Sequence, residues 1–130
     1  MRVRRGRRVS DAARPSHDHV AGEGFAREVI VARLDGCVVG WLRFGYLWDA
    51  IPFMNLLFVL EPHRGRGLGR GLVLFWEDQM RQRGYGRVMT STQADEDAQH
   101  FYRRLGYADV GRFTLPDAPA AELLLVKSLP

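Results

Sequence analysis

The stretch Arg64-Gly-Arg-Gly-Leu-Gly-Arg-Gly71 joins an apolar run to a segment with helical periodicity. The run before it, Ile51–Leu60, has the length and composition of a buried strand. After it, apolar residues recur every three or four positions from Leu68 to Met80, with charged residues on the opposite side. A strand, a glycine turn and a helix start form an anion site, because backbone N–H groups converge there and the helix dipole favours negative charge. The predicted ligand is a phosphate or pyrophosphate.

Two common phosphate-binding motifs do not fit the spacing of these glycines. A P-loop requires a Lys after its last glycine, and the only Lys in the chain is Lys127. The dinucleotide fingerprint Gly-X-Gly-X-X-Gly fails because the glycines fall at 65, 67, 69 and 71. Arg-Gly repeats also occur in disordered RNA-binding tails, and a glycine turn can be purely structural. The flanking strand and helix favour an anion site over both alternatives.

What does fit is the pattern Arg-X-X-Gly-X-Gly, at Arg64, Gly67 and Gly69. Further along the chain, Ala98–Tyr107 reads Ala-Gln-His-Phe-Tyr-Arg-Arg-Leu-Gly-Tyr. With the strand that precedes the glycines, these motifs resemble the GNAT superfamily of acyl-CoA-dependent N-acetyltransferases. The resemblance covers residues 25–130, and it implies an N-acetyltransferase domain there.

Composition predicts a single globular domain preceded by a tail. The chain has 130 residues, of which 46% are hydrophobic and 26% charged. No apolar stretch is long enough for a membrane helix, and the Arg-rich start lacks the apolar stretch of a secretory signal. We expect residues 1–24 to form a flexible Arg-rich tail and a degenerate N-terminal element. A short helix is expected there, near Asp11–Arg14 or Asp18–Val20.

The basic net charge belongs to that tail. Five of the 19 Lys and Arg residues lie in the first eight positions, and the other 14 are balanced by 15 acidic residues. The tail could contact nucleic acid, but a solvated end is the ordinary outcome, so no specific nucleic-acid partner is expected. Cys37 is the only cysteine, which favours a reducing cytoplasm. The four His residues lack metal-ligand spacing, and no metal is expected.

The remaining segments predict an α/β fold with a mixed, mostly antiparallel central sheet and helices on both faces, as in the GNAT core. Asp35-Gly36 between two β-rich runs predicts a hairpin. The predicted strands are Glu28–Leu34, Cys37–Tyr46, Ile51–Leu60, Arg87–Thr92, Tyr107–Leu115 and Glu122–Leu129. The predicted helices are Leu68–Gln82, which ends at Gly84, and a second one that carries Phe101 and Tyr102 and ends at Gly106.

Relatives in this superfamily usually begin with a strand and one or two helices that wall the acceptor pocket. Only about 24 residues precede the first clear strand here, so the first strand is expected to be missing or degenerate. This departure bears on acceptor binding more than on cofactor binding. The sequence is compatible with a homodimer but does not decide the oligomeric state.

The resemblance assigns acetyl-CoA as co-substrate and implies the residues that bind it. The diphosphate would rest on the backbone from Arg66 to Arg70, with Arg64 at the mouth. The pantetheine arm would pair with the strand backbone, where the N–H of Val59 would face the thioester oxygen. The cofactor-binding residues are therefore Leu57, Phe58, Val59, Arg64, Gly65, Arg66, Gly67, Leu68, Gly69 and Arg70.

Tyr102 is the catalytic acid by its position in the second motif, because a phenol can donate a proton to a departing thiolate. Its alternative role is a packed aromatic residue. Asp95 stands where many relatives carry an Asn that contacts the cofactor. The acceptor candidates are Tyr46, Trp48, Asp49 and Asn55: aromatic rings and a carboxylate suit a cationic amine, and a buried amide needs a partner. The general base stays unassigned: Glu61 lies at the end of the strand beside the site but could equally be a surface residue, and a water chain is the alternative.

The predicted function is acetyl transfer from acetyl-CoA to a primary amine, on a small molecule or a peptide, by direct attack in a ternary complex. The main alternative is a non-catalytic acyl-CoA-binding or interaction domain. A nucleic-acid-binding module that uses the Arg-rich tail is a third reading.

Overall fold

The computed structural model describes residues 13–22 and 25–130. Strands dominate it, with two α-helices and one short 3-10 helix. In chain order the elements are β1 (Ala13–Gly22), β2 (Phe25–Leu34), β3 (Cys37–Leu47), β4 (Ile51–Val59), η1 (Glu61–His63), α2 (Leu68–Gln82), β5 (Arg87–Gln93), α3 (Ala98–Arg104), β6 (Ala108–Phe113) and β7 (Glu122–Ser128).

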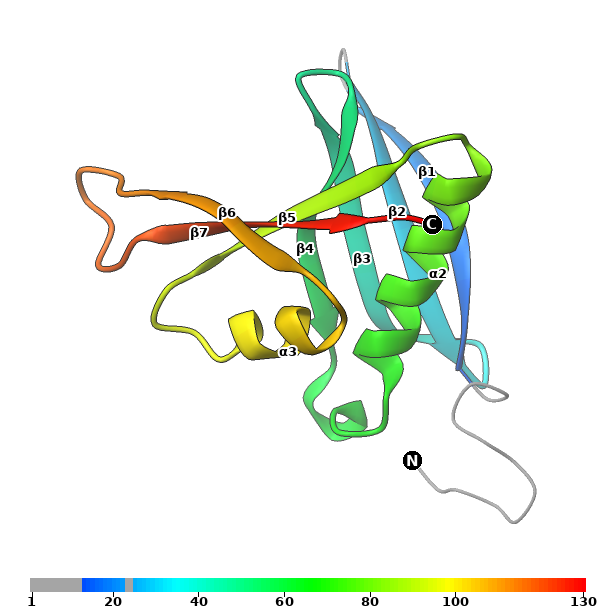
Figure 1. The fold of residues 1–130 in the computed structure, drawn as a ribbon. Helices are drawn as coiled ribbons and strands as arrows, with labels where there is room; N and C mark the ends of the chain where they lie inside the picture. Colours follow the sequence, from blue (N-terminus) through cyan, green and yellow to red (C-terminus); the bar gives the residue numbers. More distant parts are fainter. Residues whose placement is uncertain (1–12, 23–24) are drawn as a thin grey trace.

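The strands form one seven-stranded sheet in the order β1-β2-β3-β4-β5-β7-β6 (Figure 1). Every neighbouring pair is antiparallel except β4 and β5, which run parallel because α2 crosses between them. The predicted mixed, mostly antiparallel sheet is confirmed. The predicted strands and helices between residues 28 and 130 are all present, with bounds that differ by a few residues at most.

The core lies between the sheet and α2. The buried stripe of this helix includes Leu72, Trp76 and Met80, all with 0% exposed area, and it packs on buried side chains of β2, β3 and β4. The rings of Trp76 and Phe44 are 5.7 Å apart. Tyr102 of α3 joins the same buried cluster. In the part of the chain that the structure describes, both α-helices therefore pack against one face of the sheet, whereas the sequence analysis predicts helices on both faces.

The N-terminal side differs from the prediction. Residues 13–22 form β1, which pairs antiparallel with β2 along its whole length. The helix predicted at Asp18–Val20 is therefore wrong, and of the alternative Asp11–Arg14 the described residues 13 and 14 are also strand. The physical reason is tertiary: β2 offers a continuous edge of backbone donors and acceptors, and pairing with it outweighs a weak local pattern. Residues 1–12, which hold the Arg-rich stretch, lie outside the described residues.

A split between the two parallel strands determines where a ligand can enter. β4 and β5 pair at only two positions, Phe53 with Met89 and Met54 with Thr90. Beyond Met54 the strands diverge, and β4 continues to Val59 with only β3 beside it. The last residues of β4 therefore have an edge without a neighbouring strand, next to the glycine-rich loop.

Candidate functional site

The glycine-rich loop links β4 to α2 in a conformation that its glycines allow. Gly65 has φ 75° and Gly67 has φ 82°, both in the left-handed region that side chains with a Cβ rarely adopt. Gly67 is also the N-cap of α2. The alternation of glycines in the sequence thus has a backbone reason at two of its positions.

The start of α2 is open to an anion. No side chain caps it, and its first turn holds no acidic residue. The first helical hydrogen bond runs from the Gly71 N–H to the Gly67 carbonyl, at 2.9 Å. The N–H groups of Leu68, Gly69 and Arg70 therefore have no partner within the helix, and the positive end of the helix dipole lies with them.

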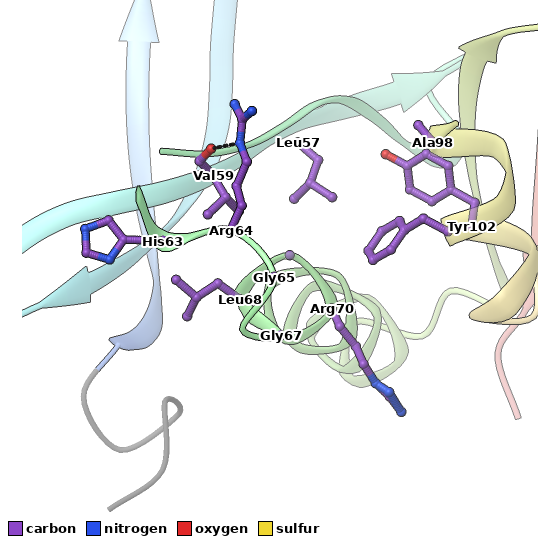
Figure 2. A pocket seen from close by; sticks show the side chains of 12 residues that line it. Leu57, Val59, His63, Arg64, Gly65, Gly67, Leu68, Arg70, Ala98 and Tyr102 are labelled. Atoms are coloured by element: carbon purple, nitrogen blue, oxygen red, sulfur yellow. Dashed lines mark hydrogen bonds between the residues drawn. The ribbon is translucent and has the colours of Figure 1, made fainter. Parts of the chain in front are cut away.

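A cavity of about 370 Å³ extends from this loop to α3 (Figure 2). It is mostly apolar, with the loop backbone and two Arg residues at its rim. Its lining residues are Leu57, Val59, His63, Arg64, Gly65, Gly67, Leu68, Gly69, Arg70, Ala98, Phe101 and Tyr102. Eight of the ten residues that the sequence predicts for the cofactor line this cavity; Phe58 and Arg66 do not.

Phe58 does not line the cavity but contacts Arg64, which does. The guanidinium of Arg64 lies 5.1 Å from the centre of the Phe58 ring, and its Nε donates a 2.7 Å hydrogen bond to the Val59 carbonyl. These two contacts hold Arg64 against the end of β4, and Figure 2 shows the hydrogen bond to Val59. His63 also lies in this wall. Its Nδ1 atom is buried and has no hydrogen-bond partner within the described structure. A bound phosphate could supply the missing acceptor.

The free edge of β4 presents backbone groups to the cavity. The N–H of Leu60 donates to the Val39 carbonyl of β3 at 2.9 Å. Because successive residues of a strand point their N–H and C=O groups to alternate sides, those of Val59 and Leu57 face away from β3. The N–H groups of Val59 and Leu57 and the Leu57 carbonyl are therefore available to an extended ligand, whereas the Val59 carbonyl already accepts from Arg64 and the backbone of Phe58 faces β3.

A second cavity of about 210 Å³ occupies the split between β4 and β5. It is more polar than the first. Its lining residues are Asn55, Leu56, Leu57, Thr90, Ser91, Thr92, Gln93, Glu96, Ala98, Tyr102 and Glu122. Leu57, Ala98 and Tyr102 line both cavities. These three side chains therefore form the boundary between the pocket beside the glycine-rich loop and the more polar one.

Tyr102 projects from α3 toward Leu57 at this boundary (Figure 2). Its side chain is 6% exposed and packs edge-on against Phe101 and Tyr107, with ring centres 5.2 Å and 5.7 Å away. Burial raises the pKa of Tyr102 above its ordinary value of 10.0, the neighbouring Thr90 side chain lowers it, and the negative charge of Glu96 raises it. The phenol therefore stays protonated at neutral pH.

The predicted acceptor residues do not come together. Asn55 lines the second cavity, but Tyr46, Trp48 and Asp49 line neither. The Tyr46 hydroxyl donates to Glu28 at 2.8 Å, and burial together with this carboxylate raises its pKa to about 12. Trp48, 82% exposed, and Asp49 form the turn between β3 and β4, at the end of β4 opposite the glycine-rich loop.

Several lining residues were not singled out from the sequence. His63 lies next to the first motif, and Ala98 and Phe101 lie within the second, so their positions relative to the motifs were a usable signal. Thr90, Thr92 and Glu122 carry no local signal, because only the pairing of β5 with β7 brings Glu122 to the split.

The described residues contain neither a metal-binding cluster nor a membrane-spanning helix. No cluster of three or more His, Cys, Asp or Glu residues in this part of the chain could hold a metal ion. Neither of its α-helices has the length and apolar character needed to cross a bilayer.

Comparison with known proteins relates the chain to one family and to one curated relative. A model of the acetyltransferase (GNAT) family matches residues 7–107. Streptothricin acetyltransferase from Streptomyces lavendulae is 31% identical over 104 residues, which make up 78% of this chain and 55% of that protein. The chain thus spans about half the length of this curated relative.

Two solved structures share the fold at low sequence identity. A GNAT family acetyltransferase from Elizabethkingia anophelis, with acetyl-CoA bound, superposes with a TM-score of 0.71 at 17% identity, covering 79% of this chain and 76% of the other. Nourseothricin acetyltransferase superposes with a TM-score of 0.70 at 20% identity, covering 95% and 91%.

Proposed function

Because the chain belongs to the acetyltransferase (GNAT) family, we propose that it transfers an acetyl group from acetyl-CoA to a primary amine in a ternary complex. One observation carries the proposal: Tyr102 stands between a pocket with an uncapped helix start and a polar pocket. A donor and an acceptor bound in the two pockets would meet at this side chain.

The first pocket offers groups that suit the diphosphate and the pantetheine arm of the donor. The N–H groups of Leu68 to Arg70 would bind the diphosphate, and Arg64 adds positive charge at the rim. The pantetheine arm would follow the free edge of β4 and bond to the backbone of Leu57 and Val59. The N–H of Val59 would then donate to the thioester oxygen as negative charge develops there.

The reaction needs positioning more than a nucleophile from the protein. The neutral amine attacks the thioester carbonyl carbon, a C–N bond forms and the C–S bond breaks, the nitrogen loses a proton, and the sulfur gains one. Holding both reactants in place supplies up to about 7–11 kcal/mol. Since its pKa is raised, Tyr102 stabilises the departing thiolate chiefly as a hydrogen-bond donor.

The relatives support a small-molecule acceptor. The curated relative is named for streptothricin, and one solved neighbour holds acetyl-CoA. We place the reaction in a reducing compartment such as the cytoplasm, because Cys37 is the only cysteine and no disulfide can form within the chain.

The test is Tyr102→Phe. We expect turnover to fall about tenfold or more, while the dissociation constant of acetyl-CoA by calorimetry stays within twofold of the parent value, because only the hydroxyl is removed. In the parent, activity should fall when the Tyr102 phenol loses its proton. This fall should occur above pH 10, since the pKa of Tyr102 is raised. The variant should lack that fall. Parental turnover in the variant would remove Tyr102 from the mechanism.

A non-catalytic acyl-CoA-binding domain is the second candidate. It is favoured by the direct succession of β1 and β2, which only residues 23 and 24 separate, and by the placement of both described α-helices on one sheet face. The acceptor pocket is therefore less enclosed than in relatives with helices at this point. Thiol release that stays at background across a panel of amines, with acetyl-CoA bound, would favour this candidate.

A further inference from the structure

We propose that the cavity between β4 and β5 binds the acceptor through a positive charge separate from its reacting nitrogen, with Glu96 and Glu122 as the recognising carboxylates. The acceptor class is then a small molecule with at least two amino groups. This inference rests on the proposed function and specifies its acceptor.

The two carboxylates reach the cavity from different parts of the chain. Glu96 lies in the loop between β5 and α3, and Glu122 opens β7 opposite Gln93 of β5. Because Thr92 and Gln93 are consecutive in β5, their side chains point to opposite faces of the sheet. Glu122 pairs with Gln93 and shares its face, whereas Thr90 and Tyr102 close the cavity on the helix side. Glu122 therefore stands on the side away from the helices. An acceptor can approach from that side while the donor enters beside α2.

The carboxylates have no cation to pair with. Neither Glu96 nor Glu122 forms an ion pair with any residue from 28 to 130, and no Lys or Arg lines the cavity. Two like charges at one pocket raise its negative potential and favour a cationic ligand. The charge of Glu96 already acts on Tyr102 at the boundary of the two cavities, because it raises the pKa of that phenol.

A buried hydroxyl points to the same ligand independently of the charges. Thr92 is 7% exposed and lines the cavity, yet its hydroxyl makes no hydrogen bond to another described residue. The hydroxyl of Thr90, the other buried threonine of the described chain, donates to the Met54 carbonyl at 3.0 Å. A buried polar group that opens into a cavity is normally matched by a ligand or water. The N–H groups of an ammonium ion would match it here.

Glu96 is held in position by a chain of side-chain contacts. The amide of Gln99 donates to the carbonyls of Ala94 and Glu96 at 2.8 Å and 2.9 Å. Arg103 in turn donates to the Gln99 oxygen at 2.8 Å and makes a two-pronged ion pair with Asp109. The backbone of the loop that carries Glu96 is thereby fixed to α3, the helix that carries Tyr102.

The experiment compares Glu96→Gln, Glu122→Gln and the double variant with the parent and with Asp117→Asn, an exposed acid remote from both cavities. The probe is spermidine, titrated calorimetrically into protein saturated with coenzyme A. The thermal midpoint of each variant, measured in parallel, checks folding. We expect about three- to tenfold weaker binding in each single variant and a larger loss in the double variant. Asp117→Asn should bind like the parent, and parental binding should weaken with added NaCl.

Steady-state kinetics with acetyl-CoA then separate recognition from chemistry. KM for spermidine should rise in the double variant, while the KM for acetyl-CoA stays within about twofold. Absence of spermidine binding in the parent, or equal binding in the double variant, overturns the inference. Binding that depends on the two carboxylates, but without acetyl transfer, overturns the proposed function instead and leaves the cation site standing.

Discussion

At the residue scale, the site depends on backbone groups that have no side chain in front of them. Gly67 combines a φ of 82° with the N-cap position of α2. A Cβ built there would meet no protein atom within 4 Å, so the space in front of it is open. Any side chain at this position would be strained by the backbone and would point into the room that a diphosphate needs.

Gly67→Val tests this. We expect acetyl-CoA affinity to fall at least about tenfold, because the branched side chain obstructs the N–H groups and destabilises the loop conformation. The matched control is Gly71→Ala, one turn later in the same helix, where a Cβ also meets no protein atom within 4 Å and the residue does not line the cavity. Calorimetry should give near-parental affinity for the control. Unchanged affinity in Gly67→Val would contradict the assigned anion site.

At the scale of elements, two hairpin turns have the same left-handed backbone conformation but differ in how well their residues suit it. Asp35 and Gly36 have φ 53° and 82°, and they join β2 to β3. This is the left-handed pair that the Asp-Gly signal predicts, and the predicted hairpin is confirmed. Trp48 and Asp49 join β3 to β4 with φ 53° and 55°, although Trp and Asp are poorer residues for this conformation.

We expect the double substitution Trp48→Asn with Asp49→Gly to stabilise the protein. Asn-Gly suits two consecutive left-handed residues, and Trp48 is 82% exposed, so little packing is lost. The free energy of unfolding should rise by about 1 kcal/mol, which corresponds to about 3–6 °C in the thermal midpoint by calorimetry. Acetyl-transfer rates should not change, because neither residue lines a cavity. A lowered midpoint would show that Trp48 has a packing role after all.

At the scale of the whole molecule, one buried polar cluster ties distant segments together. Glu77 of α2 is 2% exposed; it accepts a 2.9 Å hydrogen bond from Tyr107 and pairs with Lys127 of β7 at 2.8 Å. Burial and the Glu77 charge raise the pKa of Tyr107, so its hydroxyl remains a donor. Tyr107 in turn packs on Tyr102. The cluster thus fixes α2 and β7 around the ring next to the proposed acid.

Lys127→Met should lower the free energy of unfolding by about 3 kcal/mol, because it leaves the Glu77 carboxylate buried without its cation. Arg81→Met is the matched control: it breaks an exposed ion pair with Asp78 and should cost less than about 0.5 kcal/mol. Both values come from urea unfolding. Adding Glu77→Leu and Tyr107→Phe to Lys127→Met should restore much of the loss. Equal effects of the two single variants would mean that burial does not strengthen the Lys127 pair.

By itself, the sequence determined the local architecture: α2 from Leu68 to Gln82, the Asp35-Gly36 hairpin, and the glycine-rich loop with its anion preference. These follow from periodicity and backbone freedom, which act over a few residues. Only the tertiary structure decided three things: the pairing of β1, the separation of Trp48 and Asp49 from the cavities, and the meeting of Glu96 with Glu122. Each depends on which strands are neighbours, and strand pairing joins residues far apart in the chain, so no local pattern encodes it.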